Sequence, residues 1–362
     1  MSAAAEPVDP RRVRLWVVGF GTVGRWVIRA LHERGERIAE RYGVTFEVVG
    51  LANRRDGFIH VPDGLDLGRV LDLVSPGASI TEHPGTERHP SALEGMRSSD
   101  ADVLVEVTAS PSDGGQPGVD HIRGALERGI PVVTSNKWPV ALAGVELAAL
   151  ARQRSTELRA ESTVMSGTPL LGPLVEGLAG ATPLGLRGVL NATANFILTE
   201  IAAGKPYEDA LADAQAAGLA EPDPRADVDG HDTVAKVMIL AATVFGRQLS
   251  RDEVRSRGIS ALTSAEIELA RSDDRRLREV ATLDFSEPDG AGAVTARVEP
   301  IPLTTDDPLA RIAGTNNAVV CRADPLAEIT IAGPGAGPQL AGQGVLSDLI
   351  AVARRARDAR SR

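Results

Sequence analysis

The sequence predicts an α/β protein with a doubly wound parallel sheet, followed by a second domain of the α+β class. Short apolar segments alternate with helical patterns through residues 1–157, and a glycine-rich turn follows the first apolar segment. Alternating strands and helices are typical of a parallel sheet covered by helices on both faces. The pattern then changes, so we expect a second domain over residues 158–322.

Composition excludes several classes of protein. The chain has 362 residues and 43% hydrophobic content, enough for two domains with cores of their own. Its net charge of −10 argues against nucleic acid or an anionic membrane as the main partner. The single cysteine, Cys321, excludes an internal disulfide and fits a reducing compartment. Without an apolar leader or membrane-length segment, we expect a cytoplasmic enzyme or sensor.

A glycine-rich turn follows the first apolar strand. Residues 13–18 lead into Gly19, Gly21 and Gly24, spaced as GxGxxG, and a helical apolar pattern follows. Such glycines allow a tight turn, bring backbone N–H groups to a pyrophosphate and let the helix pack on the strand. The motif is weak alone, but its place between a strand and a helix is the required context. We therefore expect a Rossmann-type sheet that binds a dinucleotide; the alternative is a glycine turn without a ligand.

The end of the second strand, residues 46–52, indicates which dinucleotide is preferred. An NAD enzyme usually places Asp or Glu there to bind the ribose 2′-hydroxyl. This chain has Asn53, Arg54 and Arg55 instead. Two guanidinium groups without a carboxylate favour a 2′-phosphate, so we predict that Arg54 and Arg55 contribute to NADP binding, with NAD as the alternative cofactor.

Two further strands place polar residues at the edge where a cofactor would lie. Residues 102–108 and 130–134 read as buried strands, each followed by a helical pattern. Thr108 ends the first of them, and Lys137 follows the second. Ligands of a doubly wound sheet lie at the carboxyl ends of its strands. We therefore expect Thr108 and Lys137 to face the cofactor; for Lys137 the alternative is a solvated helix start.

The stretch at residues 221–245 is the strongest candidate for a catalytic site. Lys236 follows Asp232 by one helical turn, and residues 237–245 carry no charge, which predicts a buried helix. A lysine in an apolar interior loses hydration, which favours its neutral form and allows proton exchange near neutral pH. Five carboxylates precede the lysine: Glu221, Asp223, Asp227, Asp229 and Asp232.

This acidic stretch has two other interpretations. Asp227 or Asp229 would cap the helix, and Asp232 with Lys236 would form a solvated i, i+4 ion pair. A calcium loop of the EF-hand type is excluded, because with Gly230 at its sixth position the first and last ligands would be Arg225 and Lys236.

The rest of the second domain predicts a polar pocket and a sheet. Segments 161–169 and 191–198 are dense in small and amide residues, which are typical of a site for a polar small molecule. The remaining elements are strands near 186–190, 277–285, 293–300, 317–322 and 326–332, with helices at 264–271 and from 337 onward.

Six motifs, in this order along the chain, resemble those of homoserine dehydrogenase: GFGTVG, VVTSNKW, ESTVMSGTP, RGVLNATANFILTEI, AEPDPRADVDGHDTVAKVMILA and IAGPGAGPQLAGQGVLSDLI. The resemblance covers nearly the whole chain and is closest to the short form, without aspartokinase or a C-terminal ACT domain. It implies NAD(P)-dependent interconversion of L-aspartate 4-semialdehyde and L-homoserine in threonine and methionine biosynthesis. It also implies a homodimer formed by the middle region, and a return of residues 323–362 to the dinucleotide-binding domain.

The resemblance implies roles for individual residues. Lys236 is the first candidate for the proton donor, Lys137 is the second, and Asp232 orients Lys236. The implied substrate site is Glu221, Asp227, Asp232 and Lys236. The implied cofactor site is Gly21, Thr22, Val23, Thr108, Lys137 and Gly337, next to Gly19 and Gly24. A monovalent cation, sodium, is implied at Glu161, Val164, Ser166 and Thr168, bound mostly by backbone carbonyl groups.

The sequence departs from the family pattern at two loops. Met165 and Ser166 replace a glycine and a small residue, and the run beginning at Asn191 replaces a GTTNY-like run. These departures leave two alternatives: a related dehydrogenase acting on another small amino acid, such as an aspartate dehydrogenase-like enzyme, or a dinucleotide sensor without catalysis. A sensor has no need of a proton donor, so Asp232 and Lys236 favour an enzyme.

Overall fold

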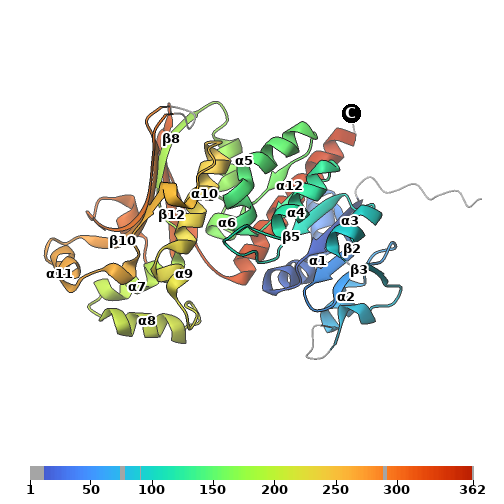
Figure 1. Cartoon of the computed structure of the whole chain (residues 1–362), viewed down its shortest axis with the longest axis horizontal. Helices are drawn as coiled ribbons and strands as arrows, with labels where there is room; N and C mark the ends of the chain where they lie inside the picture. The colour runs from blue at the N-terminus through green and yellow to red at the C-terminus, as the bar shows by residue number, and fades with distance from the viewer. Residues whose placement is uncertain (1–11, 74–77, 90, 288–291, 361–362) are drawn as a thin grey trace, which may run out of the picture. The chain divides into compact units, whose positions relative to one another are not determined.

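The computed structural model describes residues 12–73, 78–89, 91–287 and 292–360 (Figure 1). The chain forms two compact units, which are described separately. The first unit comprises Met1–Asn136, Glu146–Ala160 and Ala341–Arg362, and the second comprises Lys137–Val145 and Glu161–Leu340. The predicted boundaries were 157 and 323. The C-terminal return begins later because Ala327–Pro334 forms a strand in the sheet of the second unit.

The first unit contains the predicted parallel sheet, with an antiparallel extension. Strands β2, β1, β5, β6 and β7 are parallel neighbours, and β3 and β4 continue the sheet in antiparallel pairing beyond β2. The chain reverses direction across the sheet at β1, which produces the switch point of a doubly wound fold. The strands are β1 (Arg12–Val18), β2 (Thr45–Asn53), β3 (Gly57–His60), β4 (Glu87–His89), β5 (Val103–Glu106), β6 (Val132–Thr134) and β7 (Leu158–Arg159).

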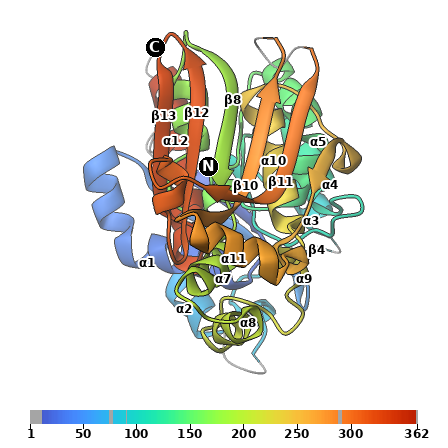
Figure 2. The same cartoon turned by 90° about the vertical axis from the view of Figure 1, so that its left-hand side faces the viewer.

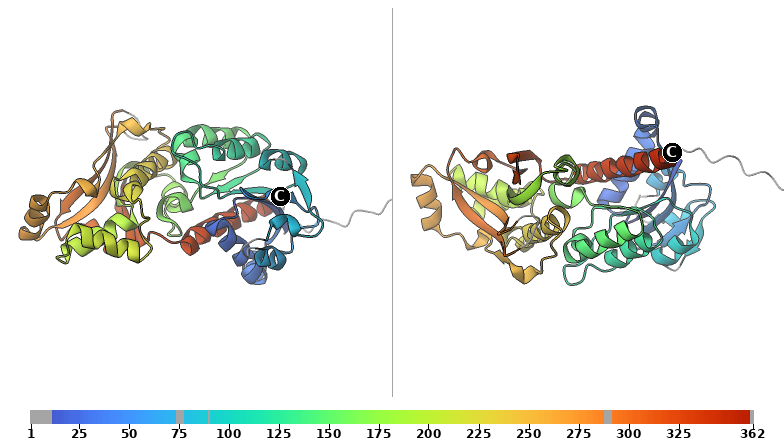
Figure 3. Two further views of the ribbon diagram at one scale, coloured as in Figure 1. Left: turned by 60° about the horizontal axis from the view of Figure 1, so that its bottom comes forward. Right: turned by 90° about the horizontal axis from the view of Figure 1, so that it is seen from above.

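Helices bury their apolar faces against this sheet. The terminal helix α12 (Pro338–Arg360) places Val345, Leu349 and Val352 in the same core as β1, as its apolar pattern predicted (Figure 3). The other helices are α1 (Thr22–Tyr42), α2 (Leu67–Asp72), α3 (Ala92–Ser98), α4 (Gly118–Glu127) and the part of α5 (Lys137–Gln153) that begins at Glu146; its first part, Lys137–Val145, belongs to the second unit. No helix in the described part of the chain is both long and apolar enough to cross a membrane.

The second unit is built on a six-stranded sheet of order β13-β12-β8-β10-β11-β9 (Figure 2). All of its pairings are antiparallel except that of β9 with β11. This mixed sheet with its helices confirms the predicted α+β class. The strands are β8 (Thr182–Val189), β9 (Val254–Ser256), β10 (Arg276–Phe285), β11 (Val294–Leu303), β12 (Asn316–Asp324) and β13 (Ala327–Pro334).

Helix α10 (His231–Val244) is the buried helix that the uncharged run predicted. Gly230 precedes it with a left-handed backbone (φ 79°), and the ten consecutive residues 233–242 are all buried. The helix packs against β10 and α9 (Arg225–Val228). The remaining helices of the unit are α6 (Ser162–Met165), α7 (Ala192–Ala202), α8 (Tyr207–Ala216) and α11 (Ser264–Ser272).

Candidate active site

Two lysines share one carboxylate at the start of α10. Asp232 accepts a hydrogen bond from Lys137 Nζ on Oδ1, and its Oδ2 lies 2.8 Å from Lys236 Nζ. Lys137 is the first residue of α5, whereas Asp232 and Lys236 lie on successive turns of α10. The Lys137 side chain is 38% exposed and that of Lys236 only 9%. Lys137 is therefore the more accessible ammonium group. Lys236 contacts the same carboxylate from the buried side.

Lys236 is buried as expected, but oxygen atoms replace the water that it loses. Its Nζ donates to the carbonyl oxygen of Leu190 at 2.6 Å, in addition to its ion pair with Asp232. Asn317 Nδ2 donates to the same carbonyl at 2.8 Å. The end of β8 thus holds the lysine amine in place, and one N–H of the ammonium group remains for another acceptor.

The two lysines fix the charge of the carboxylate. Burial would raise the pKa of Asp232, but the charges of Lys236 and Lys137 and their hydrogen bonds outweigh it and hold that pKa well below its usual range. The Asp232 charge raises the pKa of Lys137 more than desolvation lowers it. At neutral pH the cluster therefore presents a protonated Lys137 beside an ionised Asp232.

Of the two further carboxylates predicted to bind the substrate, Asp227 is near this cluster and Glu221 is not tied to it. Asp227 on α9 accepts a hydrogen bond from Asn191 Nδ2 at 2.9 Å. Burial raises its pKa, against the hydrogen bond from Asn191 and the charges of the two lysines. Glu221 is exposed, and its carboxylate makes no hydrogen bond or ion pair within the described chain. The structure thus brings Asp227, Asp232, Lys236 and Lys137 together.

The remaining aspartates of the acidic stretch have other partners. Asp223 pairs with Arg225 at the surface, and Asp229 accepts a hydrogen bond from Ser260 Oγ at 2.5 Å. Helix α10 has Gly230 at its N-cap and no side-chain hydrogen bond there. The alternative that Asp227 or Asp229 caps this helix is therefore wrong, because a left-handed glycine makes the turn.

In the first unit, the three glycines of the turn have different reasons to be glycine. A Cβ atom at Gly19, where φ is 113°, would lie 2.6 Å from the carbonyl carbon of Val107, and one at Gly24 would lie 2.1 Å from Gly19 O. A Cβ atom at Gly21 would meet nothing within 4 Å. The turn places Thr22 and Val23 in the first turn of α1, whose N-cap has no side-chain hydrogen bond. Space at Gly21 and free N–H groups at a helix start suit a pyrophosphate.

A buried carboxylate holds Thr108 at the end of the β5 region. Glu106 is fully buried and accepts hydrogen bonds from the N–H and hydroxyl of Thr108 and from the Thr134 hydroxyl. Asn136 Nδ2 donates to Thr108 Oγ1 at 3.2 Å. Sequence reasoning selected Thr108 but missed Glu106. The signal for Glu106 was a carboxylate directly after the apolar run 103–105, in a segment expected to be a buried strand.

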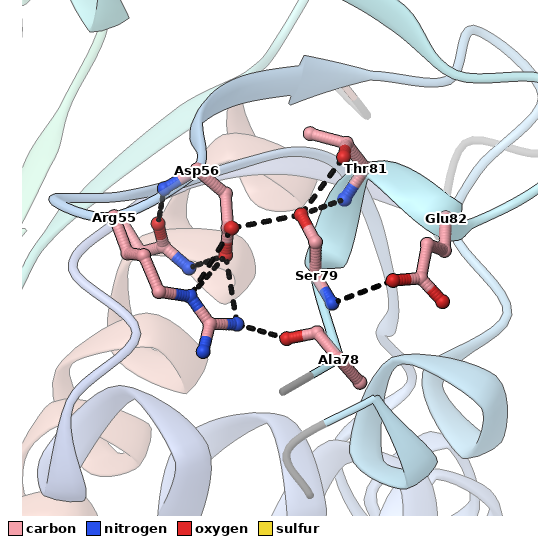
Figure 4. A network of polar contacts seen from close by, with 7 residues as sticks. Arg55, Asp56, Ala78, Ser79, Thr81 and Glu82 are labelled. Carbon is pink, nitrogen blue, oxygen red and sulfur yellow. Dashed lines mark hydrogen bonds and ion pairs between the residues drawn. The ribbon is translucent and has the colours of Figure 1, made fainter. Parts of the chain in front are cut away.

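The two arginines after β2 differ in their partners, and Figure 4 shows those of Arg55. Arg55 donates from Nε to Asp56 Oδ1 at 3.2 Å and from Nη2 to the carbonyl of Ala78. Asp56 also accepts from Asn53 Nδ2 and Ser79 Oγ, both at 2.7 Å. Burial would raise the pKa of Asp56, but these hydrogen bonds lower it to about 2. Arg54 is exposed and forms no ion pair with any described residue.

The Glu161 carboxylate is occupied by backbone amide groups. Oε1 accepts from Leu170 N at 2.6 Å and Leu171 N at 2.7 Å, and Oε2 accepts from Gly172 N at 2.8 Å. The side chain therefore holds the chain segment that precedes the short helix Pro173–Gly177. Within the described ranges, no group of three or more acidic, histidine or cysteine side chains could hold a metal ion.

The loop after Glu161 is tied to the segment that follows β13. Ser166 has a positive φ of 54°, and its hydroxyl donates to Gly335 O at 3.0 Å. Thr168 Oγ1 donates to Pro334 O at 2.9 Å, and Val164 is buried. Gly337, predicted to contact the cofactor, follows this segment with φ 129° and precedes α12. The loop is thus ordered by side chains whose hydroxyl groups are already donating.

Comparisons with known proteins identify the family of the chain. A family model described as "Homoserine dehydrogenase" matches residues 169–350, and one described as "Homoserine dehydrogenase, NAD binding domain" matches residues 19–161. An "NAD(+)-dependent homoserine dehydrogenase" of Pseudomonas canavaninivorans is 37% identical, over 94% of this chain and 96% of the relative. A homoserine dehydrogenase of Methanocaldococcus jannaschii is 33% identical, over 93% of this chain and 97% of the relative.

Solved structures give the same result. A structure titled as a putative homoserine dehydrogenase of Archaeoglobus fulgidus aligns with a TM-score of 0.81 and 31% identity, over 94% of this chain and 99% of that chain. A hyperthermophilic archaeal homoserine dehydrogenase in complex with NADPH aligns with a TM-score of 0.79 and 31% identity, over 95% of this chain and 98% of that chain. The chain belongs to the homoserine dehydrogenase family and is an NAD(P)-dependent oxidoreductase.

Proposed function

We propose that this protein interconverts L-aspartate 4-semialdehyde and L-homoserine, with Lys236 and Lys137 as the groups that exchange the proton. The observation that carries the proposal is Asp232, which joins both ammonium groups at the start of α10. Reduction of the aldehyde requires a proton on the carbonyl oxygen, and positioned ammonium groups can supply it. Family membership supports the choice of substrate.

The cluster can stabilise the charge that develops during reduction. When bound, the reduced cofactor supplies a hydride to the carbonyl carbon. A lysine ammonium group then stabilises the nascent alkoxide and donates a proton to its oxygen, and Asp232 keeps both amines in place. In the reverse direction a neutral lysine accepts the proton of the homoserine hydroxyl. Lys236 is the first candidate for the donor, with Lys137 sharing or taking the role.

The carboxylates before α10 can bind the amino group of the substrate. Asp227 is half-buried, 2.9 Å from the Asn191 amide, and Glu221 is exposed on the same acidic stretch. A substrate ammonium group needs such acceptors, whereas the aldehyde end needs donors. We therefore assign amine binding to Asp227 and Glu221. NADPH and NADH oxidation should be compared with aspartate semialdehyde, other aldehydes and 2-oxo acids; faster oxidation with a 2-oxo acid and ammonia would contradict the proposal.

The dinucleotide is contacted by the glycine turn and the strand ends. Gly19, Gly21 and Gly24 shape the turn, and Thr22 and Val23 lie in the first turn of α1. We assign contacts with the cofactor to Thr108, Lys137 and Gly337 as well. Support comes from the buried Glu106 carboxylate that fixes Thr108, and from the position of these residues after strand ends.

We propose a preference for NADP in which Arg54 carries most of the contact with the 2′-phosphate. Arg55 is bound to Asp56 and to the carbonyl of Ala78, whereas Arg54 is exposed without an ion pair among the described residues. The compared relatives include one named for NAD+ and one solved with NADPH. We therefore propose that the two arginines determine the choice between NADP and NAD. Arg54 contributes more than Arg55, because Arg55 is already bound to groups of the protein.

Arg54→Ala is expected to lower the ratio of kcat/KM with NADPH to kcat/KM with NADH by about 10- to 100-fold, because a charge-assisted contact is lost. Arg55→Ala is the matched control and is expected to change the ratio much less. Steady-state kinetics with both cofactors measure the effect. A larger change in Arg55→Ala than in Arg54→Ala would reverse the assignment.

We propose a sodium site formed by backbone carbonyl groups of Glu161, Val164, Ser166 and Thr168. The Glu161 carboxylate is used by three amide groups, so it orders the loop and leaves ligation to carbonyl oxygens. Replacing sodium by choline should lower the stability of the protein, by about 2.7 kcal/mol if sodium was 100-fold above its Kd. Thermal unfolding in the two salts at equal ionic strength tests this proposal. Equal Tm values would contradict the sodium site.

We propose a cytoplasmic homodimer assembled through the second unit. β13 is at the edge of the six-stranded sheet, and Leu326 beside it is 49% exposed. An uncovered edge strand with apolar neighbours favours pairing with another chain. The acidic composition and the single buried cysteine fit a reducing compartment. Light scattering should give the mass of two chains, and a monomer at micromolar concentration would contradict the assembly.

A further inference from the structure

The catalytic cluster has a buried carboxyl group behind it that the proposed reaction does not use. Glu279 on β10 is 1% exposed, and its Oε1 accepts a hydrogen bond from Thr233 Oγ1 at 2.6 Å. Its Oε2 is buried and has no hydrogen-bond partner in the described part of the chain. Thr233 directly follows Asp232 on α10, so the carboxyl group is one residue removed from the ion pair.

The charged groups around Glu279 are those of the active site. Asp232 and Lys236 come from α10, and Asp227 comes from α9. A Cβ atom at Gly230 would lie 2.9 Å from Ser256 Oγ on β9, 3.3 Å from Val298 on β11 and 3.6 Å from Glu279 Oε2, so an uncharged wall closes this side.

On the face of β10 that carries Glu279, apolar side chains of α7 and α11 pack in one core with Leu277. Leu277 has the same orientation on β10, two residues before Glu279, and its buried neighbours include Ile197 and Leu198 of α7 and Ala270 of α11. Arg278 has the opposite orientation and donates to the carbonyl of Ala310 at 3.0 Å. The charges that act on the Glu279 carboxyl group thus include those of Asp232, Lys236 and Asp227 at the active site.

We propose that Glu279 is a positioning residue, which acts through Thr233 and through its own charge on the Asp232–Lys236 pair and thereby sets how the reaction depends on pH. The proposal rests on the proton-exchange role assigned to the lysines. Within the described part of the chain, Glu279 accepts its hydrogen bond from Thr233, whereas the Lys236 amine donates to the Leu190 carbonyl group. It influences the reaction by being neutral at one end of the working pH range and charged at the other.

The electrostatic environment places this change of charge near neutral pH. Burial raises the pKa of Glu279 to about 7, the charges of Asp232 and Asp227 add to the effect, and the Thr233 hydrogen bond and Lys236 oppose it. Glu279 is therefore neutral below pH 6 and negative above pH 8. Its negative charge stabilises protonated lysine at alkaline pH, which retains the proton donor for aldehyde reduction.

Glu279→Gln tests the proposal by removing only the charge. The alkaline limb of kcat for aldehyde reduction is expected to move to lower pH by about half to one unit, because no anion then favours the protonated lysine. Below pH 6 the variant should match the wild type, whose Glu279 is neutral there. An equal change in kcat at every pH would show a merely structural role and overturn the proposal.

Thermal unfolding reports the ionisation of Glu279 independently of catalysis. A raised folded pKa means that the stabilising protonated form is fully present below the unfolded value of 4.5 and is lost as pH rises through about 7. The gain in Tm of Glu279→Gln over the wild type should therefore grow between pH 5 and pH 8. A gain that does not change with pH overturns the proposal.

Two further variants complete the experiment. Thr233→Val removes the hydrogen bond that favours the charged form, so the pH dependence of Tm should move to higher pH. Glu299→Gln, on the neighbouring strand with a 40% exposed side chain, is the matched control and should show no effect. If Lys236 and Lys137 prove dispensable, the proton-exchange proposal fails in the kinetics, while the Tm titration still reports on Glu279 alone.

Discussion

Lys236→Ala is expected to lower kcat by about 10²- to 10⁴-fold, the range that general acid help typically contributes. Cofactor binding should remain, because the glycine turn and Arg54 lie in the other unit. The loss has two causes. The variant has no ammonium group at the end of β8, and Asp232 keeps only Lys137 as a partner. Stopped-flow kinetics and cofactor titration by fluorescence measure the two properties separately.

Matched variants identify which lysine donates the proton. Lys236→Met fills the space that alanine leaves, so an equal loss in both variants excludes a packing defect. Lys205→Ala removes an exposed lysine paired with Glu200 and Asp213, and it should leave kcat unchanged. The same kinetics and cofactor titration are applied to Lys137→Ala. If Lys236→Met retains near-normal kcat and Lys137→Ala does not, the donor is Lys137 and Lys236 only orders the site.

Asp232→Asn is expected to affect stability as strongly as activity. Removing one member of a buried ion pair typically costs about 3–5 kcal/mol, because the partner charge remains buried without compensation. Here two ammonium groups would lose their shared anion and repel one another. We also expect kcat to fall by about 10²-fold, because neither amine is then held in place. Denaturant unfolding and steady-state kinetics measure these losses.

The stability difference should depend on pH with a defined sign. The folded pKa of Asp232 is lowered, so its contribution is present above the unfolded value of 3.8 and is lost as pH falls through the folded value. The gap between wild type and Asp232→Asn should therefore be full at pH 7 and shrink below pH 4. Asp213→Asn, at an exposed ion pair, is the control and should change stability little. A constant gap down to pH 3 would contradict the assignment.

Local sequence patterns predicted the parts of the fold that depend on neighbouring residues. The glycine turn, the strand that ends before Thr108 and the buried helix with Lys236 all follow from spacing and polarity within one segment. The family and the α/β fold are confirmed by the comparisons. The role of each site residue stays a prediction until the variants are measured.

Contacts between distant segments could not be derived from those patterns. Asp232 meets Lys137 across 95 positions, and Thr233 meets Glu279 across 46. The sequence offered two arginines after β2 without distinguishing them, and only the folded loop shows the carbonyl group of Ala78 accepting a hydrogen bond from Arg55 across 23 positions. The resemblance placed Glu161 at a cation site, but it could not show that the Glu161 carboxylate accepts hydrogen bonds from amide groups 9, 10 and 11 positions away. Each of these pairings forms only when folding brings separated positions of the chain into contact.

The glycine turn shows how a binding motif can be separated into folding and ligand requirements. Gly19 and Gly24 are demanded by the protein's own backbone, since any side chain there would overlap a carbonyl group. Gly21 faces empty space, so the polypeptide alone would tolerate alanine or serine at that position. A homologue that no longer bound a nucleotide would thus still need Gly19 and Gly24 for its own fold. Gly21 is therefore the one position of the motif at which a substitution would indicate that nucleotide binding had been lost.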